Sequence, residues 1–219
     1  MKKLITCGCS FTYGDGLVEP QKTSYGALLG KYLNLEHINL ALRGSSNHGV
    51  TLQIEHALNN YSDIDTIVVS STSYQRFPVY IDEYQNEPHN KLTYQDLVTG
   101  KVQFENAKAI LNTGNSINSH RLKSIERYVV DVYHQNIQQS LEDKALSFEC
   151  RNILDRGIKL ILITPSFNLL KYFDKNSLKY SFFDQMNIHP DTLGTMHISE
   201  TGHNILFHLI KEKFYGRTT

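Results

Sequence analysis

A serine near the N-terminus and a histidine near the C-terminus could act together as a nucleophile and its base. Ser10 stands on a turn of small residues that directly follows the short apolar run of residues 4–6. His197 lies in a loop, residues 194–203, that leads into a helical pattern. A serine hydroxyl is a weak nucleophile at neutral pH and needs a base within hydrogen-bond reach. These two residues therefore indicate acyl-transfer chemistry if the fold brings them together.

The turn around Ser10 and a later glycine-containing loop follow the motif order of a known family. Residues 8–14 read Gly-Cys-Ser-Phe-Thr-Tyr-Gly, and residues 39–47 read Asn-Leu-Ala-Leu-Arg-Gly-Ser-Ser-Asn. This order resembles the SGNH/GDSL hydrolase superfamily, whose first motif is Gly-Asp-Ser-x-x-x-Gly; here Cys9 stands at the aspartate position. The resemblance implies that Ser10 is the nucleophile. It also implies that the backbone N–H groups of Ser10 and Gly44 point into an oxyanion hole.

The third donor of such an oxyanion hole has several candidates. The family's third motif ends in an asparagine, whereas residues 67–74 of this chain end in Ser-Thr-Ser-Tyr. Ser73 stands at the place of that asparagine and could donate its hydroxyl, and Asn47 and Gln75 are the alternatives. The loss of one preorganised donor typically costs ~100- to 1000-fold in rate. The expected oxyanion or substrate-binding residues are therefore Gly44, Ser73 and Asn47.

The group that orients the base is the least defined part of the pattern. The family's last motif, Asp-x-x-His, is matched at His197, but Gly194 occupies the aspartate position. An imidazole base needs an acceptor that fixes its tautomer. Asp191 is the nearest carboxylate and would complete a triad, whereas a backbone carbonyl would leave a Ser–His dyad. The expected catalytic residues are therefore Ser10, His197 and, in the triad, Asp191.

Strand and helix patterns alternate along the chain. Strands are predicted at residues 3–9, 35–40, 66–71 and 159–164, and helices at 23–34, 47–61, 124–156 and 199–214, the third of them broken or bent. This alternation predicts a parallel sheet with right-handed crossovers and helices on both faces. Together with the resemblance it predicts one domain over residues 1–219, a three-layer α/β/α, flavodoxin-like SGNH hydrolase fold. Ser10, Gly44, Ser73 and Pro165 then fall at the carboxyl ends of the strands, where such sheets bind ligands.

Two segments depart from this alternation. Residues 77–123 are polar, too long for an ordinary connector, and follow the third strand, so they form an insertion. Residues 79–81 and 101–104 could pair as a hairpin within it, and the insertion could be a cap over the site or a contact between subunits. Residues 166–196 are rich in aromatic side chains, which could form a second small core or an acyl or sugar platform; the core is the favoured interpretation. These side chains are Phe167, Tyr172, Phe173, Tyr180, Phe182 and Phe183.

The composition excludes several classes of protein. The 22 basic and 22 acidic residues cancel, and no basic stripe indicates a nucleic-acid partner. No apolar run approaches the ~20 residues of a membrane span, and the N-terminus lacks a signal-peptide pattern. The cysteines at 7, 9 and 150 cannot form a disulfide framework, so a cytoplasmic location is expected. Cys7 and Cys9 are expected to lie on one face of a strand as small buried residues.

Three functions fit these observations. The first is a serine esterase that hydrolyses a small acyl or O-acetyl ester, including esters carried on a carbohydrate, without a cofactor or metal. The second is an SGNH-like binding domain with little or no catalysis, which the missing asparagine and aspartate favour. The third is a metal hydrolase built on His189, Asp191, His197 and His203, but the spacing of these residues matches no compact ligand motif. The sequence does not predict the oligomeric state.

Overall fold

The computed structural model describes residues 1–80, 93–98, 102–107, 119–191, 193–194 and 196–216. Five of the strands form one sheet, and every neighbouring pair in it is parallel. They are β2 (Glu36–Asn39), β1 (Lys3–Cys7), β3 (Ile64–Ser70), β6 (Lys159–Thr164) and β7 (Ser177–Lys179), in that spatial order. Counted along the chain, this is the 2-1-3-4-5 order of flavodoxin-like folds. The predicted three-layer α/β/α architecture is confirmed.

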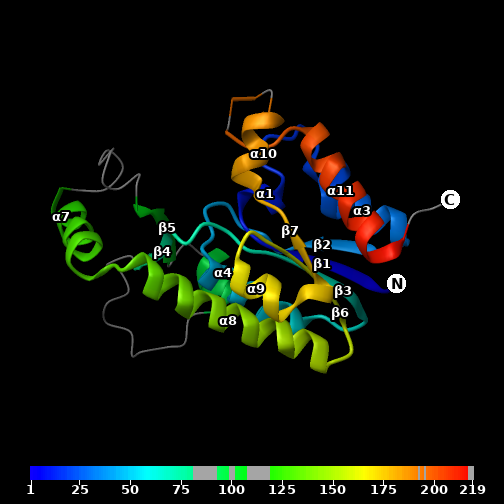
Figure 1. Cartoon of the computed structure of the whole chain (residues 1–219), viewed down its shortest axis with the longest axis horizontal. Helices are drawn as coiled ribbons and strands as arrows, with labels where there is room; N and C mark the ends of the chain where they lie inside the picture. The colour runs from blue at the N-terminus through cyan, green and yellow to red at the C-terminus, as the bar shows by residue number, and fades with distance from the viewer. Residues whose placement is uncertain (81–92, 99–101, 108–118, 192, 195, 217–219) are drawn as a thin grey trace.

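One face of the sheet is covered by α4 (Asn47–Asn60), α8 (Gln135–Asp155) and the shorter α9 (Phe167–Tyr172) (Figure 1). The central strands are apolar and β-branched, and their side chains are buried on both faces. On this face Ile67 and Leu160 of the sheet share one core with Val50 and Ile54 of α4 and with Ile153 of α8. The helix predicted over residues 47–61 is confirmed.

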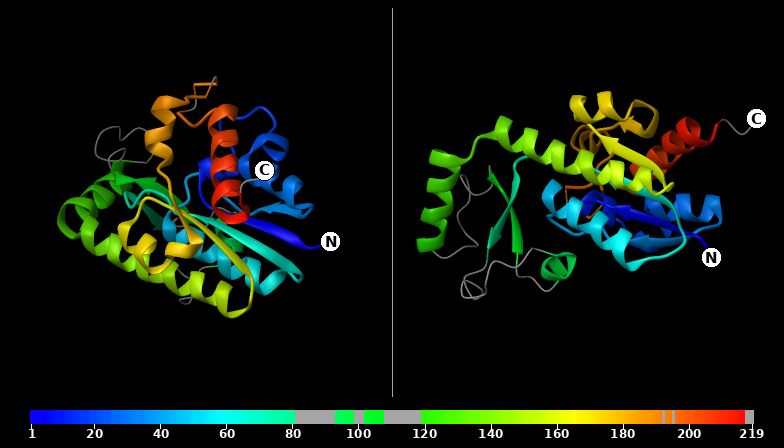
Figure 2. Two further views of the ribbon diagram at one scale, coloured as in Figure 1. Left: turned by 45° about the vertical axis from the view of Figure 1, so that its right-hand side comes forward. Right: turned by 90° about the horizontal axis from the view of Figure 1, so that it is seen from below.

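The other face carries α3 (Tyr25–Leu33) and α11 (Glu200–Tyr215), with α10 (Phe182–Ile188) and α1 (Ser10–Tyr13) toward the carboxyl ends of the strands (Figures 1 and 2). The short α2 (Pro20–Thr23) precedes α3. Ser199 caps α11 by accepting the N–H of Gly202, as its residue type predicts. Tyr32 of α3 and Leu209 of α11 lie at the edges of the packed faces, since each is 38% exposed.

The described part of the insertion lies beyond the carboxyl ends of the strands, on the side away from the N-terminus (Figure 2). β4 (Arg76–Tyr80) and β5 (Val102–Asn106) pair in antiparallel fashion, which confirms the predicted hairpin. α5 (Tyr94–Val98) and β5 pack on α4 through a small core that contains Leu52, Leu97 and Val102. The remainder of residues 77–123 falls largely outside the described residues, apart from the start of α7.

The long helical stretch before the fourth strand of the sheet is interrupted, as predicted. α7 (Ser119–Arg127) continues into η2 (Tyr128–Val132), a π-helical segment, and α8 begins afterwards at Gln135. Two other expectations were wrong. The first strand ends at Cys7 rather than at residue 9, and the chain turns there, so Cys7 and Cys9 enter the cores on opposite faces. The three-residue strand β7, which follows the 3-10 turn η3 (Asp174–Asn176), was missed because it is too short for a periodic pattern.

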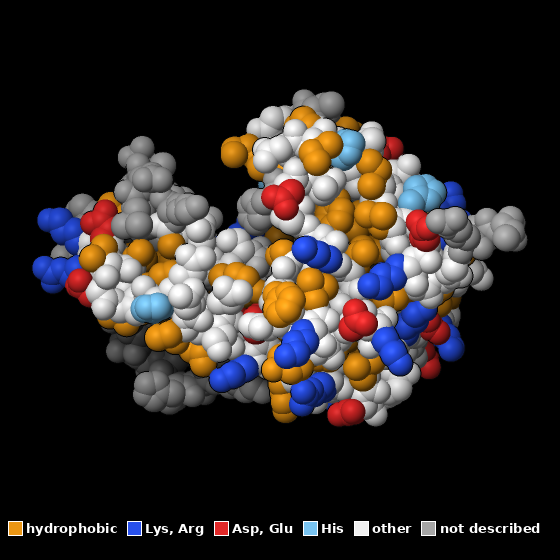
Figure 3. Space-filling view, viewed as in Figure 1, with side chains coloured by type: hydrophobic (Ala, Val, Ile, Leu, Met, Phe, Trp, Pro, Cys, Tyr) orange, Lys and Arg blue, Asp and Glu red, His pale blue; other side chains and the backbone are white. Residues whose placement is uncertain are grey.

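The surface shown in Figure 3 carries Lys and Arg side chains interspersed with Asp and Glu, as expected for a chain with no net charge. Among the described helices, none combines the length and apolar character needed to cross a bilayer.

Candidate active site

Ser10 is the first residue of α1, directly beyond the carboxyl end of β1, and it is buried. The chain can turn this sharply because residue 8 is a glycine. A Cβ atom at Gly8 would lie 2.7 Å from Cβ of Thr12, closer than real side chains allow. α1 ends after one turn at Gly14, whose φ of +96° is a left-handed conformation that glycine adopts readily. The predicted turn after the first strand is therefore present, and Ser10 begins a single helical turn that was not predicted.

The turn is held from α4 by the fully buried side chain of Gln53. Its Oε1 accepts the N–H of Gly8 at 2.7 Å, and its Nε2 donates to the Gly8 carbonyl at 3.1 Å and to Oγ of Ser45 at 3.2 Å. The Gly8 carbonyl also accepts the N–H of Leu42. Gln53 thus ties the Ser10 turn to the loop that carries Gly44. Sequence reasoning missed this role, although Gln53 is three residues after Val50 and four before Ala57, on the buried face of α4.

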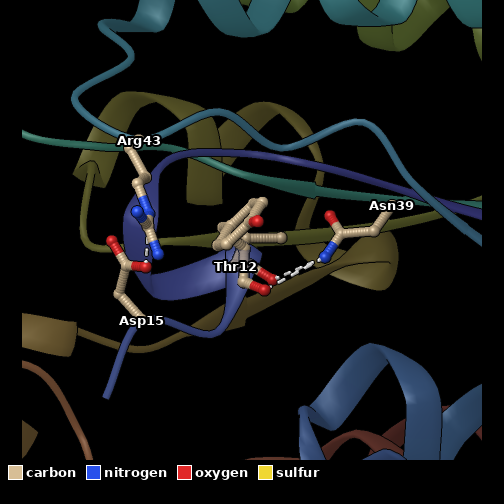
Figure 4. A network of polar contacts seen from close by, with 5 residues as sticks. Thr12, Asp15, Asn39 and Arg43 are labelled. Atoms are coloured by element: carbon tan, nitrogen blue, oxygen red, sulfur yellow. Dashed lines mark hydrogen bonds and ion pairs between the residues drawn. The ribbon is translucent and has the colours of Figure 1, made fainter. Parts of the chain in front are cut away.

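A second set of contacts joins the same two segments nearer the surface (Figure 4). Nδ2 of Asn39 donates to the carbonyls of Thr12 and Tyr13, at 3.3 and 3.2 Å. Nε of Arg43 donates to Oδ1 of Asp15 at 2.7 Å, and its guanidinium lies 5.0 Å from the centre of the Tyr13 ring. The end of β2 and the loop after it are therefore fixed against the end of α1.

Of the predicted oxyanion residues, Gly44 and Ser73 lie on the loops after β2 and β3, which flank β1 in the sheet, and Asn47 is the first residue of α4. Gly44 has a φ of +73°, a left-handed conformation that favours glycine. Ser73 is half-buried, and its Oγ accepts the N–H of Gln75 at 3.2 Å. That hydroxyl keeps its own hydrogen for donation to another acceptor.

Asn47 supports the loop after β3. Its Oδ1 accepts the N–H of Thr72 at 2.7 Å, and its Nδ2 donates to the Thr72 carbonyl at 3.1 Å and to Oε2 of Glu142 at 2.9 Å. Both amide hydrogens are therefore engaged inside the protein. In this arrangement Asn47 positions the loop that carries Ser73, a role that the sequence did not indicate.

Two adjacent buried acids of α8 bind the loops after β3 and β6. Glu142 accepts hydrogen bonds from Asn47 and from Nε2 of Gln138. Asp143 accepts the hydroxyls of Tyr74, at 2.9 Å, and of Ser166, at 3.0 Å. Burial raises the pKa of Glu142 from 4.5 to about 7, an effect that its hydrogen bonds oppose and that the neighbouring Asp143 increases.

His197 reaches the N-terminal turn through Phe11, the residue after Ser10. The centres of the Phe11 and His197 rings are 4.7 Å apart. The loop after α1 also approaches the base, because a Cβ atom built on Gly16 would lie 3.1 Å from Cβ of His197 and 2.8 Å from Cβ of Asp191. Residues that the sequence places near opposite ends of the chain are thus gathered in one place.

Asp191 interacts with the backbone of the His197 loop. Its Oδ2 accepts the N–H of His197 at 2.8 Å, and its Oδ1 accepts the N–H of Leu193 at 2.7 Å. Its own N–H donates to the His197 carbonyl at 2.9 Å. Gly194, at the family's aspartate position, has a φ of +69° in the bend between them. Asp191 therefore fixes the position of His197 through the main chain.

The other titratable residues of the C-terminal segment do not gather into a metal site. Within the described ranges, no three His, Cys, Asp or Glu residues lie close enough to hold a metal ion. His203 is fully buried inside α11, where its Nδ1 accepts the N–H of Tyr25 at 3.3 Å. Burial and the nearby His197 lower the pKa of His203 to about 3, so its ring stays neutral.

The aromatic residues of the C-terminal segment divide into two groups. Phe173, Tyr180 and Phe182 are buried, and Phe182 stacks on Phe11 with ring centres 5.1 Å apart. Phe173 belongs to the core between the sheet and α4 and α8, whereas Tyr180 and Phe182 belong to the core on the opposite face, so the expectation of a separate second core was wrong for these described residues. Phe167 and Tyr172 are 78% and 65% exposed. The side chain of Phe183 lies outside the described residues.

The first prediction concerns Gln53. Gln53→Leu keeps the volume of the side chain but leaves the buried N–H of Gly8 without its acceptor. A buried donor that loses its partner costs about 1–3 kcal/mol, so we expect the free energy of unfolding in urea to fall by about 2 kcal/mol. The control is Gln21→Leu on the exposed face of α2, which should change this value by less than about 0.5 kcal/mol. Equal unfolding midpoints for the two variants would contradict the role assigned to Gln53.

The second prediction concerns Glu142. The pKa of Glu142 is higher in the folded protein than in the unfolded chain, so protonation of Glu142 stabilises the folded state. This stabilisation is fully present below pH 4.5 and is lost as the pH rises through about 7. Glu142→Gln removes the titration. Relative to this variant, the wild-type free energy of unfolding should fall by up to about 3 kcal/mol between about pH 5 and pH 8. Parallel stability curves over this range would show that Glu142 has an ordinary pKa.

Comparison with known proteins gives structural likenesses only. No protein-family model matches the sequence, and no curated protein matches it. A protein from Desulfitobacterium hafniense that is assigned to the lipolytic G-D-S-L family is 14% identical, with a TM-score of 0.48 over 97% of this chain and 99% of that one. A member of the same family from Veillonella parvula is 14% identical, with a TM-score of 0.37 over 98% and 99%. A protein from Slackia heliotrinireducens that is assigned as an SGNH hydrolase is 12% identical, with a TM-score of 0.36 over 97% and 98%.

The fold is established by the strand order of the sheet itself.

Proposed function

We propose that this protein is a serine ester hydrolase of the SGNH/GDSL type, which acts on a small acyl or O-acetyl ester, including esters carried on a carbohydrate. The observation that carries the proposal is the contact between the rings of Phe11 and His197. It brings an imidazole to the residue that follows Ser10, at the carboxyl edge of the sheet where parallel α/β folds bind ligands. The order of the sequence motifs and the contact between the Phe11 and His197 rings thus both support Ser10 and His197 as the catalytic pair.

In this mechanism Oγ of Ser10 attacks the carbonyl carbon of the ester while His197 accepts the hydroxyl proton. The carbonyl oxygen becomes an oxyanion that the backbone N–H groups of Ser10 and Gly44 stabilise, with the Ser73 hydroxyl as the third donor. The bond to the alcohol oxygen then breaks, and His197 returns its proton to the departing alcohol. Water, deprotonated by His197, attacks the acyl-enzyme in the same way and releases the acid and free Ser10.

Asp191 is a positioning residue in this proposal. Its carboxylate accepts backbone N–H groups on either side of Gly194, so it holds the loop from which the imidazole projects. This role supports a site whose main parts are a serine and a histidine, with the acid acting on the loop conformation.

A binding domain without catalysis is the second candidate. Two observations favour it: the family's third-motif asparagine is replaced by Ser73, and the amide hydrogens of Asn47 are engaged elsewhere. A covalent serine probe separates the two candidates, because only an activated Ser10 would react with it.

The third prediction tests the nucleophile. A fluorophosphonate probe should label the wild-type protein at Ser10, as mapped by mass spectrometry of the digested adduct. Ser10→Ala should abolish labelling and lower the hydrolysis of 4-nitrophenyl acetate at least ~1000-fold, with an unchanged circular dichroism spectrum. Ser140→Ala, at an exposed position of α8, should behave as wild type. Wild-type turnover by a clean Ser10→Ala preparation would rule out Ser10 as the nucleophile.

The fourth prediction separates the roles of Asp191 and His197. In a complete triad, changing the orienting aspartate to asparagine costs about 10,000-fold in rate. Asn at position 191 keeps an oxygen that can accept a loop N–H, so we expect Asp191→Asn to lower kcat less than about tenfold. His197→Ala should remove activity. If the two variants lose activity to the same depth, Asp191 acts directly on the imidazole and the triad is complete.

A further inference from the structure

The hairpin of the insertion packs directly against the loop that carries Gly44. A Cβ atom built on Gly44 would lie 3.7 Å from the carbonyl oxygen of Phe104 in β5. The Phe104 ring lies against the start of α4, because a Cβ atom built on Gly49 would meet two of its carbons at 3.1 and 3.2 Å. Leu42, from the loop after β2, packs on the same small core as Phe104. The insertion is therefore part of the surroundings of a proposed oxyanion donor.

Arg76 adds a polar contact between the same two segments. It is the first residue of β4, and its Nη1 donates to the carbonyl of Ser45, the residue after Gly44, at 3.3 Å. Because a guanidinium is always charged, its hydrogen bonds are stronger than those between neutral groups. Arg76 is half-buried and forms no salt bridge with the residues that the structure describes. The Ser45 carbonyl is therefore the partner that this side chain stabilises.

The backbone around Arg76 is fixed to the other side of the site. The N–H of Arg76 donates to the carbonyl of Ser73 at 3.2 Å, and the Gln75 carbonyl accepts the N–H of Ala107, directly after β5, at 2.8 Å. Arg76 thus binds the loop after β3 through its main chain and the loop after β2 through its side chain. These loops lie on either side of β1 and carry the proposed donors Ser73 and Gly44.

Gly44 depends on support from its neighbours. A glycine has no side chain with which to anchor itself, and its backbone has more conformational freedom than that of any other residue. Gln53 binds Oγ of Ser45 from the side of α4, and Arg76 binds the carbonyl of the same residue from the side of the insertion. Ser45 is fully buried, so water cannot easily replace either partner. We therefore expect the position of the Gly44 N–H to depend on both contacts.

We propose that Arg76 is a positioning residue of the active site, which holds the loop after β2 in the conformation that directs the Gly44 N–H to the oxyanion. This role rests on the proposed function, since the oxyanion forms only during ester hydrolysis. Arg76 is not among the described residues that line the cavity beside Ser10. Its loss should therefore affect the chemical step rather than substrate binding. The insertion then supports catalysis from outside the sheet, a role distinct from a cap or a subunit contact.

The kinetic test compares Arg76→Met, which keeps the length of the side chain without its donors, with Arg76→Lys, which keeps the charge and a donor. With 4-nitrophenyl acetate, we expect Arg76→Met to lower kcat about tenfold at an unchanged KM, as for one charge-assisted hydrogen bond whose effect is confined to the transition state. Arg76→Lys should recover part of this loss. The control Arg127→Met, at an exposed position of α7, should behave as wild type. Thermal unfolding verifies that the variants fold.

A second measurement reports on the loop without turnover. The chain contains two Arg-Gly pairs, Arg43-Gly44 and Arg156-Gly157. Protein labelled with ¹³C-arginine and ¹⁵N-glycine therefore gives two signals in a spectrum that selects glycine amides preceded by arginine. We expect the heteronuclear NOE of Gly44 to fall in Arg76→Met, because the loop gains motion on the ps–ns timescale, and to keep its wild-type value in the control. Gly157, in the turn before β6, is the internal reference.

The outcomes separate this inference from the proposed function. A lower NOE of Gly44 in Arg76→Met, when the wild type neither hydrolyses esters nor reacts with a fluorophosphonate, would support Arg76 as the anchor of the loop and overturn the esterase. Ester hydrolysis by the wild type, with the same kcat and the same NOE in Arg76→Met, would overturn the role of Arg76 and leave the esterase standing. A lower kcat without a change in the NOE, or an equal loss in Arg127→Met, would also overturn the positioning role.

Discussion

The chain leaves the sheet at Gly8, and the backbone groups buried in that turn have to be satisfied without a strand beside them. The carboxamide of Gln53 does this by pairing with both the N–H and the carbonyl of Gly8. Because the same side chain also holds Ser45, the turn of Ser10 and the loop of Gly44 share one anchor on α4. The distance between a proposed nucleophile and a proposed oxyanion donor is thus set by a buried amide rather than by the sheet alone.

The opposite wall of the site follows the same principle with carboxylates. Glu142 and Asp143 are neighbours on α8. Glu142 supports the loop after β3 through Asn47 and Thr72. Asp143 binds Tyr74 of the same loop and Ser166 of the loop after β6. Buried acids of this kind are costly unless they are hydrogen-bonded, and here the hydrogen bonds join a helix to two strand ends. The loops after β3 and β6 are therefore both supported from behind by one helix.

The sequence was informative where periodicity and residue type act locally. The strand over residues 66–71 and the helix over residues 47–61 were predicted and are present as β3 and α4. It misled where the chain changes direction, because alternation along a strand no longer applies after Cys7. The roles of Gln53 and Glu142 were not predicted, since a polar residue on a helix suggests exposure unless its burial is already known. No sequence pattern shows whether the side-chain amide of Asn47 is hydrogen-bonded within the protein, as it is here, or available to a ligand.

The ring of Phe11 is enclosed by Phe182 and His197, residues that leave the ribosome long after it. In the same way, the backbone N–H of Tyr25 donates a hydrogen bond to the imidazole of His203, which lies 178 positions further along the chain. Early segments can begin to fold during synthesis, but Phe11 cannot acquire its contacts before residues 182 and 197 have been made, nor Tyr25 its contact before residue 203. The surroundings of Phe11 and of the N-terminus of α3 are therefore completed only after residues 182–203 have been synthesised.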